Sequence, residues 1–180
     1  MSLHSVEALL DAATDAAVRQ EWAALAEAGL PSQAAHQGTT NAPHITLSVA
    51  TGVPDFVEGR IAREIDALLP VPVRLGPLLV MGSRRFVLAH LVVPSDELLR
   101  LHATVARAMS AAPEVPDVVR PGRWTPHVTL ARGLGSRQVG DALAVLGRTR
   151  PLDGSIGTVR RWDPTARRSW AVGGKPTMEP

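Results

Sequence analysis

Two short segments of the sequence repeat one pattern of residue types. The segment 43–47 reads Pro-His-Ile-Thr-Leu, and the segment 126–130 reads Pro-His-Val-Thr-Leu, 83 positions later. Histidine titrates near pH 6.5 and serves as a general acid or base at neutral pH, where each such group typically contributes about 10²–10⁴-fold to a rate. The repeat therefore predicts an acid–base site around one small anion such as phosphate, with His44 and His127 as its catalytic residues.

The motifs also predict which side chains share a surface, because residues i and i+2 of a β-strand point to the same face. On this alternation the polar face carries His44, Thr46 and Ser48 in the first segment and His127 and Thr129 in the second. We expect Thr46 and Thr129 to bind the phosphate through their hydroxyls. Arg132 follows the second motif and could stabilise charge in a transition state. Strict alternation places Arg132 on the opposite face, so it reaches the site only if the strand twists, bulges or ends there.

Two histidines could also be metal ligands. Zinc would need a further ligand, and the sequence has no Cys and no His-Glu-x-x-His motif, although Asp or Glu from elsewhere could complete a site. The absence of Cys excludes disulfides and thiol catalysis. Gly-x-Gly-x-x-Gly, P-loop and Gly-x-Ser-x-Gly motifs are missing, which disfavours nucleotide-fold, kinase-like and α/β-hydrolase proteins. We therefore expect no metal and no cofactor.

Hydrophobic periodicity predicts the elements that position the motifs. Strands are expected at 3–10, 44–50, 71–81, 86–93, 125–132, 155–162 and 168–172, and helices at 12–28, 56–69, 95–112 and 136–146. The apolar run 3–10 could also be the start of a helix. Asp11 and Ser95 are typical N-caps, and Gly29 followed by Pro31 ends the first helix. The order is β-α-β-α-β and then β-α-β-α-β-β, which indicates a mixed α and β domain.

The element order repeats at the same 83-residue shift as the motifs. At this shift Leu3 falls on Phe86, and Glu7 falls on His90, so that polar groups from the first strand of each repeat would line the same concave face. Internal repetition of this kind predicts two similar lobes. We expect one domain over 1–180 with an α+β fold, in which repeats 3–82 and 86–175 form two antiparallel-rich sheets around a central cleft, with helices outside.

Composition excludes several classes of protein. Hydrophobic residues make up 45% and charged residues 20% of the chain, which is typical of a globular domain, and no apolar run reaches the roughly 18–20 residues of a membrane span. Residues 1–95 carry 6 Lys+Arg against 9 Asp+Glu, whereas residues 96–180 carry 13 against 8. The second half could therefore form a basic wall for a phosphate-bearing ligand, or only a solvated surface. We expect a cytoplasmic monomer with no membrane partner.

The segments His44-Ile45-Thr46-Leu47 and His127-Val128-Thr129-Leu130-Ala131-Arg132 resemble the paired His-x-Thr motifs of the two-histidine phosphoesterase superfamily, and most of all its bacterial 2′-5′ RNA ligase (RNA 2′,3′-cyclic phosphodiesterase) family. The resemblance implies a bilobal fold, no metal, and hydrolysis of cyclic phosphodiesters in RNA or small nucleotides. It also implies that one histidine activates water while the other protonates the leaving oxygen, and that reversal of this chemistry gives 2′-5′ ligation.

On this basis we expect an enzyme that opens 2′,3′-cyclic phosphates to 2′-phosphates. His44 is expected to be the acid toward the 3′ oxygen and His127 the base toward water, although microscopic reversibility allows the opposite assignment. The alternative is a non-catalytic nucleotide- or RNA-binding module on the same fold, which would need no pair of titratable groups.

The family often provides an aromatic residue on which a base stacks. Trp124 and Trp162 are candidates here, with packing in the core favoured for both. We expect His102 on the surface of a helix. The basic segment 159–163 either follows an RNA phosphate or forms an exposed sheet edge.

Overall fold

The chain forms its helices and strands in the order that the sequence predicts. The structure is a computed structural model that describes residues 3–36, 38–147 and 150–174. Within these ranges the elements are β1 (His4–Leu10), α1 (Ala12–Glu27), β2 (His44–Ala50), α2 (Asp55–Ile65), β3 (Val71–Met81), β4 (Phe86–Val92), α3 (Asp96–Met109), β5 (His127–Leu134), α4 (Ser136–Leu146), β6 (Leu152–Asp163) and β7 (Arg168–Gly174). Short 3₁₀ helices lie at Gln33–Ala35, Asp66–Leu68 and Asp117–Val119. The mixed α+β class is confirmed.

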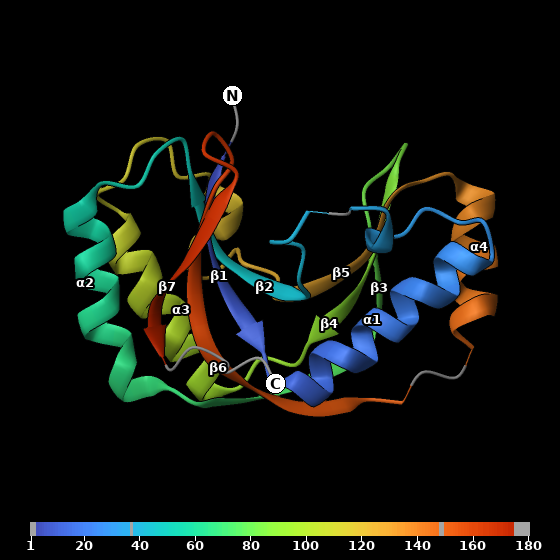
Figure 1. The fold of residues 1–180 in the computed structure, drawn as a ribbon, viewed down its shortest axis with the longest axis horizontal. Coiled ribbons are helices and arrows are strands. Elements are labelled where there is room, and N and C mark those ends of the chain that lie inside the picture. The colour runs from blue at the N-terminus through green and yellow to red at the C-terminus, as the bar shows by residue number, and fades with distance from the viewer. Residues whose placement is uncertain (1–2, 37, 148–149, 175–180) are drawn as a thin grey trace.

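One antiparallel sheet, rather than two separate sheets, connects all the strands. Their order is β1-β2-β5-β4-β3-β6-β7, with an additional pairing of β1 with β6 (Figure 1). Strand β6 is long enough to serve both sides of the molecule. Its first part, Leu152 to Ile156, pairs with β3, and its later part, to Trp162, pairs with β1. The sheet is therefore continuous from one side to the other.

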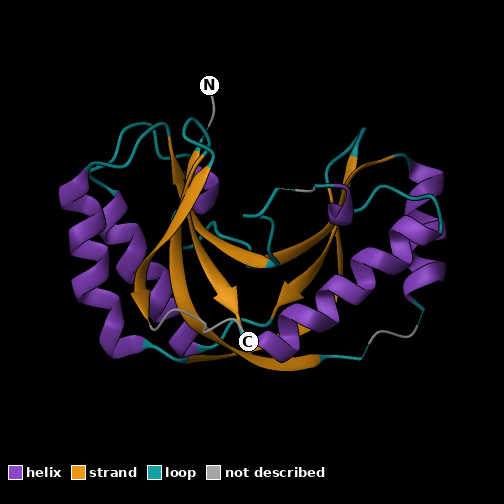
Figure 2. Ribbon diagram, viewed as in Figure 1, coloured by secondary structure: helices purple, strands orange, loops and turns teal. Residues whose placement is uncertain are grey.

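Helices cover the sheet in two groups at opposite ends of the molecule (Figure 2). Helices α2 and α3 pack together and contact β7 and β2, whereas α1 and α4 pack together and contact β5 and β4. The expected caps are present, since Asp11 accepts a hydrogen bond from the Thr14 amide and Ser95 accepts one from the Leu98 amide. Each cap of this kind stabilises a helix by about 1 kcal/mol.

Each side of the molecule combines elements from both repeats. On one side, α1 and β3 of the first repeat lie with α4, β4 and β5 of the second. On the other side, α3 and β7 of the second repeat lie with α2, β1 and β2 of the first. The reason is the connectivity, because β3 and β4 are joined as a hairpin and β6 pairs across to β1. The described helices and strands of the two repeats are thus mixed on both sides of the molecule.

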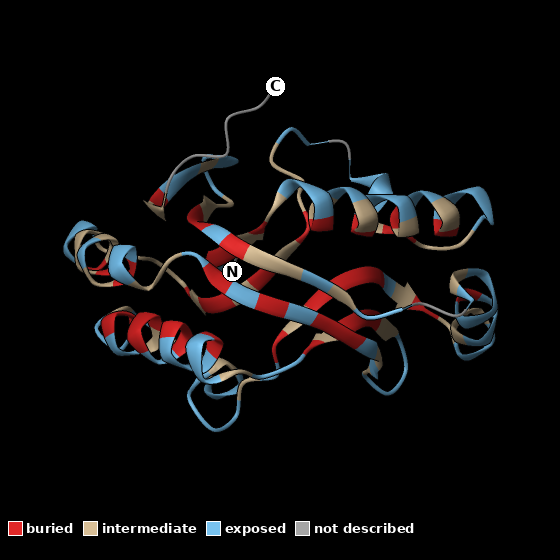
Figure 3. Ribbon diagram, turned by 90° about the horizontal axis from the view of Figure 1, so that it is seen from below, coloured by how far each residue is buried: buried red, intermediate tan, exposed pale blue. Residues whose placement is uncertain are grey.

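The faces of β2 and β5 that point toward the helices form part of the core. Ile45, Leu47, Val128 and Leu130 are all fully buried. Figure 3 shows the buried residues along the strands and on the inner sides of the helices. Burial of each such side chain contributes about 1.5–3 kcal/mol, so the two motif strands are anchored by their apolar faces.

Candidate active site

The two motif strands meet at a single residue pair, Ile45 of β2 with Val128 of β5. These residues directly follow His44 and His127. In an antiparallel pairing, residues on either side of such a pair lie across from one another. The register therefore places His44 across from Thr129, and Thr46 across from His127. Each histidine faces the threonine of the other motif, around a local twofold relationship.

Both imidazoles are oriented in the same way by a backbone carbonyl two residues earlier. His44 Nδ1 lies 2.7 Å from the Ala42 oxygen, and His127 Nδ1 lies 2.8 Å from the Thr125 oxygen. A carbonyl can only accept, so each Nδ1 carries the hydrogen and donates it. Proton transfer to a ligand is thereby left to Nε2 in both histidines, which is the arrangement that an acid–base pair requires.

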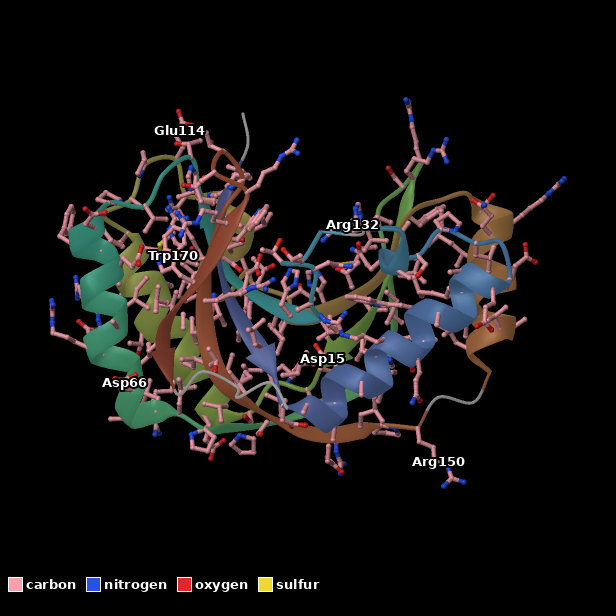
Figure 4. All side chains as sticks on the ribbon, in the orientation of Figure 1. Asp15, Asp66, Glu114, Arg132, Arg150 and Trp170 are labelled. Atoms are coloured by element: carbon pink, nitrogen blue, oxygen red, sulfur yellow. The ribbon has the colours of Figure 1, made fainter. Side chains whose placement is uncertain are left out.

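A β-bulge in β5 brings Arg132 to the site. Thr129 pairs with Ala89, and Ala131 pairs with the adjacent Leu88, so Leu130 is an extra residue in the ladder. The bulge reverses the alternation, and Arg132 then lies on the same face as Thr129. Its Nη2 is 3.3 Å from the Thr129 hydroxyl oxygen, to which it donates. Figure 4 labels Arg132 beside β5. The bulge is thus the departure from strict alternation that the sequence pattern requires for Arg132 to reach the site.

The equivalent bulge in β2 removes Ser48 from the site. Thr46 pairs with Glu7 and Ser48 with the adjacent Val6, which makes Leu47 the extra residue. Ser48 consequently lines a different cavity of about 520 Å³, together with Ala103 and Arg107 of α3. The prediction that Ser48 shares the face of His44 and Thr46 is wrong, because it assumed an unbroken alternation.

Two tryptophans hold the carbonyl groups beside these bulges. Trp22 of α1 donates from Nε1 to the Thr129 oxygen at 3.0 Å, and Trp124 donates to the Thr46 oxygen at 2.9 Å. A bulge disrupts the ladder locally, and buried carbonyls need a partner. Each motif threonine is thus fixed by an indole from the other repeat. Nothing in the sequence pattern singled out Trp22 for this role.

A family model described as the 2′-5′ RNA ligase superfamily matches residues 14–167. The chain belongs to the 2′-5′ RNA ligase superfamily. The resemblance inferred from the two His-x-Thr motifs is confirmed at this level. A search of curated protein sequences gave no match.

Among solved structures, the superfamily fold is shared with Usb1 from Kluyveromyces marxianus, at a TM-score of 0.54 and 16% identity over 94% of this chain and 97% of that chain. The structure of the same Usb1 with uridine monophosphate gives a TM-score of 0.53 and 15% identity over the same shares of the two chains. At these identities the similarity shows a common fold.

A buried carboxylate, Glu7 of β1, lies beside His44 in this superfamily member. Glu7 Oε1 is 3.6 Å from His44 Nε2 and accepts a hydrogen bond of 2.6 Å from Ser5. Its Oε2 accepts a 2.8 Å bond from Arg160 Nε. Burial would raise the pKa of Glu7, but the charges of His44 and Arg160, with the hydrogen bonds from Ser5 and Arg160, outweigh it and lower the pKa. Glu7 is therefore an anion.

The environment of His127 is different. Burial is the largest cause that lowers the pKa of His127. The hydrogen bond to Thr125 acts in the opposite direction, and the positive charges of Arg132 and His44 lower the pKa further. The neutral imidazole is thus favoured, as a general base requires.

The site opens into a cavity of about 410 Å³, which we call the cleft cavity. Its lining includes the following residues: Glu7, His36, Thr40, Asn41, His44, Arg160 and Trp162. The basic segment of β6 is not an exposed edge, because β6 lies between β1 and β7, and its Arg160 is paired with Glu7 at the wall of this cavity. Of the two tryptophan candidates, Trp162 reaches this cavity.

His90 does not line the cleft cavity, contrary to the equivalence with Glu7. It pairs with Val128 and is fully buried, with Nε2 at 2.7 Å from Glu21 of α1. The strands that pair with the two motifs, β1 and β4, correspond at a shift of 82 residues rather than 83. Leu9 of β1 pairs with His44, and Leu91 of β4 pairs with His127. One position of slip moves a side chain to the other face.

His102 is also buried, so its expected surface position is wrong. Its ring stacks on Trp124 with centroids 3.8 Å apart, and its Nε2 lies 2.9 Å from the Val119 oxygen. The segment 110–124 folds back over α3, which the helical pattern alone does not show. The ring of Trp124 therefore stacks on His102, and its Nε1 is bonded to the Thr46 carbonyl.

In the part of the chain that the structure describes, no group of three or more His, Asp or Glu side chains is arranged to hold a metal ion. In the same ranges no helix is both long and apolar enough to cross a membrane.

Proposed function

We propose that this protein is a phosphoric diester hydrolase that opens 2′,3′-cyclic phosphate ends of RNA or small nucleotides to 2′-phosphates, without a metal. The observation that carries the proposal is the pair of imidazoles with their Nδ1 atoms bonded to carbonyls, each across from the other motif's threonine. Membership in the 2′-5′ RNA ligase superfamily supports it. The uridine monophosphate bound to Usb1, which has the same fold, supports a nucleotide ligand.

The reaction uses each histidine once. His127 Nε2 accepts a proton from water as the water oxygen bonds to phosphorus. The bond from phosphorus to the ribose 3′ oxygen breaks, and His44 donates its Nε2 proton to that oxygen. The products are a 2′-phosphate and a free 3′-hydroxyl, and proton exchange with solvent restores the two imidazoles. If a 5′-hydroxyl takes the place of water, the same steps form a 2′-5′ linkage.

The phosphate is held by the polar groups between the histidines. Thr46 and Thr129 donate from their hydroxyls, and Arg132 supplies positive charge to the oxygens whose negative charge grows in the transition state. Arg132 already donates to the Thr129 hydroxyl, so the two side chains are ordered together. This is how the protein would stabilise a pentavalent phosphorus with its own side chains.

The position of the cleft cavity supports His44 as the acid. The leaving 3′ oxygen belongs to the nucleoside, so the acid must lie on the nucleoside side of the phosphorus. The cleft cavity adjoins His44, and at about 410 Å³ it is in the size range of small-molecule sites. Trp162 offers a ring for a base in this cavity. Water would then approach from the side of His127.

The test is incubation with 2′,3′-cyclic nucleotides and a cyclic-phosphate-ended oligonucleotide, in a buffer that contains a chelator, with the product identified by ³¹P NMR. We expect a 2′-phosphate from the wild type and a loss of at least about 10²-fold in each of His44→Ala and His127→Ala. His4→Ala, a histidine outside the cleft cavity, is the matched control and should retain activity.

Three results would contradict this proposal. Nucleotide binding without turnover, little changed by either His→Ala substitution, would identify a binding module instead. Activity that disappears in chelator would identify a metal-dependent reaction. A 3′-phosphate product would mean that the 2′ oxygen is the leaving group.

A further inference from the structure

We propose that Glu7 is a positioning residue whose carboxylate, next to His44 Nε2, favours proton donation from that nitrogen and thereby sets the direction of the acid–base pair. The inference rests on the proposed function, because it concerns the roles of the two histidines in that reaction. It adds a residue that the paired motifs do not contain.

Geometry restricts what Glu7 can do. His44 Nδ1 is already committed to the Ala42 carbonyl, so Nε2 is the ring atom that faces both Glu7 and a ligand in the cleft cavity. Glu7 Oε1 is 3.6 Å from that Nε2. A carboxylate at this separation stabilises an imidazolium by direct attraction. It is close enough to favour the charged ring and far enough to leave its proton available to a substrate.

Glu7 is itself held firmly. The Ser5 hydroxyl donates to Oε1, Arg160 Nε donates to Oε2, and only 5% of Glu7 is exposed. A buried ion pair is weak evidence for stability, since the desolvation of both charges offsets most of their attraction. The Glu7–Arg160 pair is therefore better explained by its position next to His44 than by a contribution to folding.

The two halves of the site differ in the residue that lies beside each histidine. Glu7 pairs with Thr46 on β1–β2, and the residue that pairs with Thr129 on β4–β5 is Ala89. The place beside His127 that corresponds to Glu7 thus has no carboxylate. Instead, the charges of Arg132 and His44 act on His127. One histidine has an anion beside it and the other has cations, which breaks the symmetry of an otherwise repeated site.

The charged and titratable groups around His44 come from several elements. Glu7 lies on β1, Arg160 on β6, His127 on β5, and His36 in the segment before β2. Of these four, Glu7 alone is an anion. Replacing it by glutamine should therefore have a specific effect on the protonation of His44.

The experiment compares the pH profile of kcat/KM for hydrolysis of a 2′,3′-cyclic nucleotide in the wild type and in Glu7→Gln. The acid controls the alkaline limb and the base controls the acidic limb. We expect Glu7→Gln to move the alkaline limb to lower pH, because the neighbouring negative charge is lost, and to leave the acidic limb almost in place. Movement of the acidic limb instead, or of neither limb, overturns the inference.

A second measurement does not depend on turnover. NMR titration of the His44 ring in both proteins, assigned with His44→Ala, should show the Glu7→Gln ring losing its proton at lower pH. If the wild type hydrolyses no cyclic phosphate but the ring titration shifts as expected, the proposed function fails and the Glu7–His44 coupling stands. If hydrolysis occurs and neither the limb nor the titration moves, the inference fails and the proposed function stands.

Two further variants separate charge from folding. Glu21→Gln is the control, because Glu21 is bonded to His90, a buried histidine outside the site. This substitution should leave both limbs of the pH profile unchanged. Glu7→Gln could leave Arg160 without a counterion, so Glu7→Gln with Arg160→Met removes both charges together. This double variant should fold and again show the lowered alkaline limb, and an unmoved limb in the folded double variant counts against Glu7.

Discussion

The indole Nε1 of Trp124 donates a hydrogen bond of 2.9 Å to the carbonyl oxygen of Thr46. The carbonyl lies beside the bulge at Leu47 that orients the first motif. Trp124→Phe removes this donor while it preserves the aromatic surface on His102. We expect a loss of stability of about 1–3 kcal/mol, because a partly buried carbonyl loses its partner, and a lower kcat at nearly unchanged KM.

Trp170→Phe is the matched control for this experiment. Trp170 of β7 also donates from its indole, but to Glu58 at the surface, and neither residue lines the cleft cavity. Urea unfolding and steady-state kinetics on both variants give the comparison. Equal effects in the two variants would mean that the Trp124 bond does not orient Thr46.

Arg132→Gln should change both the rate and the pH profile. Loss of the guanidinium removes charge stabilisation, for which we expect a decrease in kcat/KM of about 10²–10³-fold. Burial and the charges of Arg132 and His44 lower the pKa of His127 below its ordinary value of 6.5. Because the base acts when it is unprotonated, removal of one cation should move the acidic limb to higher pH. An acidic limb that stays in place would show that Arg132 does not act on His127.

The threonine hydroxyls can be tested by Thr46→Val and Thr129→Val, which keep the β-branched shape. Each substitution should reduce the stabilisation of the transition state by about 1–3 kcal/mol, which corresponds to a decrease of about 5–150-fold in kcat/KM. Thr129→Val should also release the Arg132 side chain, so it is expected to have the larger effect. An equal and negligible change in both variants would remove the threonines from the site.

The His90–Glu21 pair predicts how stability depends on pH. Burial lowers the pKa of His90, but the hydrogen bond and charge of Glu21, with the Gly76 carbonyl, outweigh it and raise the pKa above 6.5. A raised pKa in the folded state means that the stabilisation is complete below pH 6.5 and is lost as pH rises through the folded value. Glu21→Gln should therefore lower the free energy of unfolding most near pH 6 and less near pH 9.

Chemical unfolding at several pH values measures this difference. Glu64→Gln is the control, because Glu64 is bonded to Arg60 and Arg107 and to no histidine. Its effect should be independent of pH between about 6 and 9, since a carboxylate with a lowered pKa stays charged there. A Glu21→Gln effect that is equally flat would contradict the assignment.

Much of this protein could be predicted from local patterns. The order of helices and strands, the caps at Asp11 and Ser95, and the grouping of His44 with Thr46 all depend on residues close in sequence, and the structure contains them. The expected cytoplasmic location and monomeric state remain predictions. The sheet arrangement was predicted less well, because the pairing of β6 with both β3 and β1 joins segments far apart in the chain.

The errors at the site have a common physical origin. Ser48 was assigned to the face of Thr46 by counting in steps of two, the same count left Arg132 dependent on a bulge, and His90 was placed by a shift that is one residue too long for β1 and β4. That count holds only while each residue of a strand has one partner, and a bulge is a property of two strands together. The extra residues at Leu47 and Leu130 move Ser48 away and bring Arg132 in. No single segment contains this information.

The sequence by itself determined the candidate chemical groups: two histidines and two threonines in repeated motifs, on strands whose other faces are apolar. Tertiary structure decided which further groups join them. The Ile45–Val128 pairing brings the motifs together, the bulges select Arg132, and the register of β1 places Glu7 beside His44. The reason is that alternation and capping are local, whereas register and bulges arise only when distant strands pair.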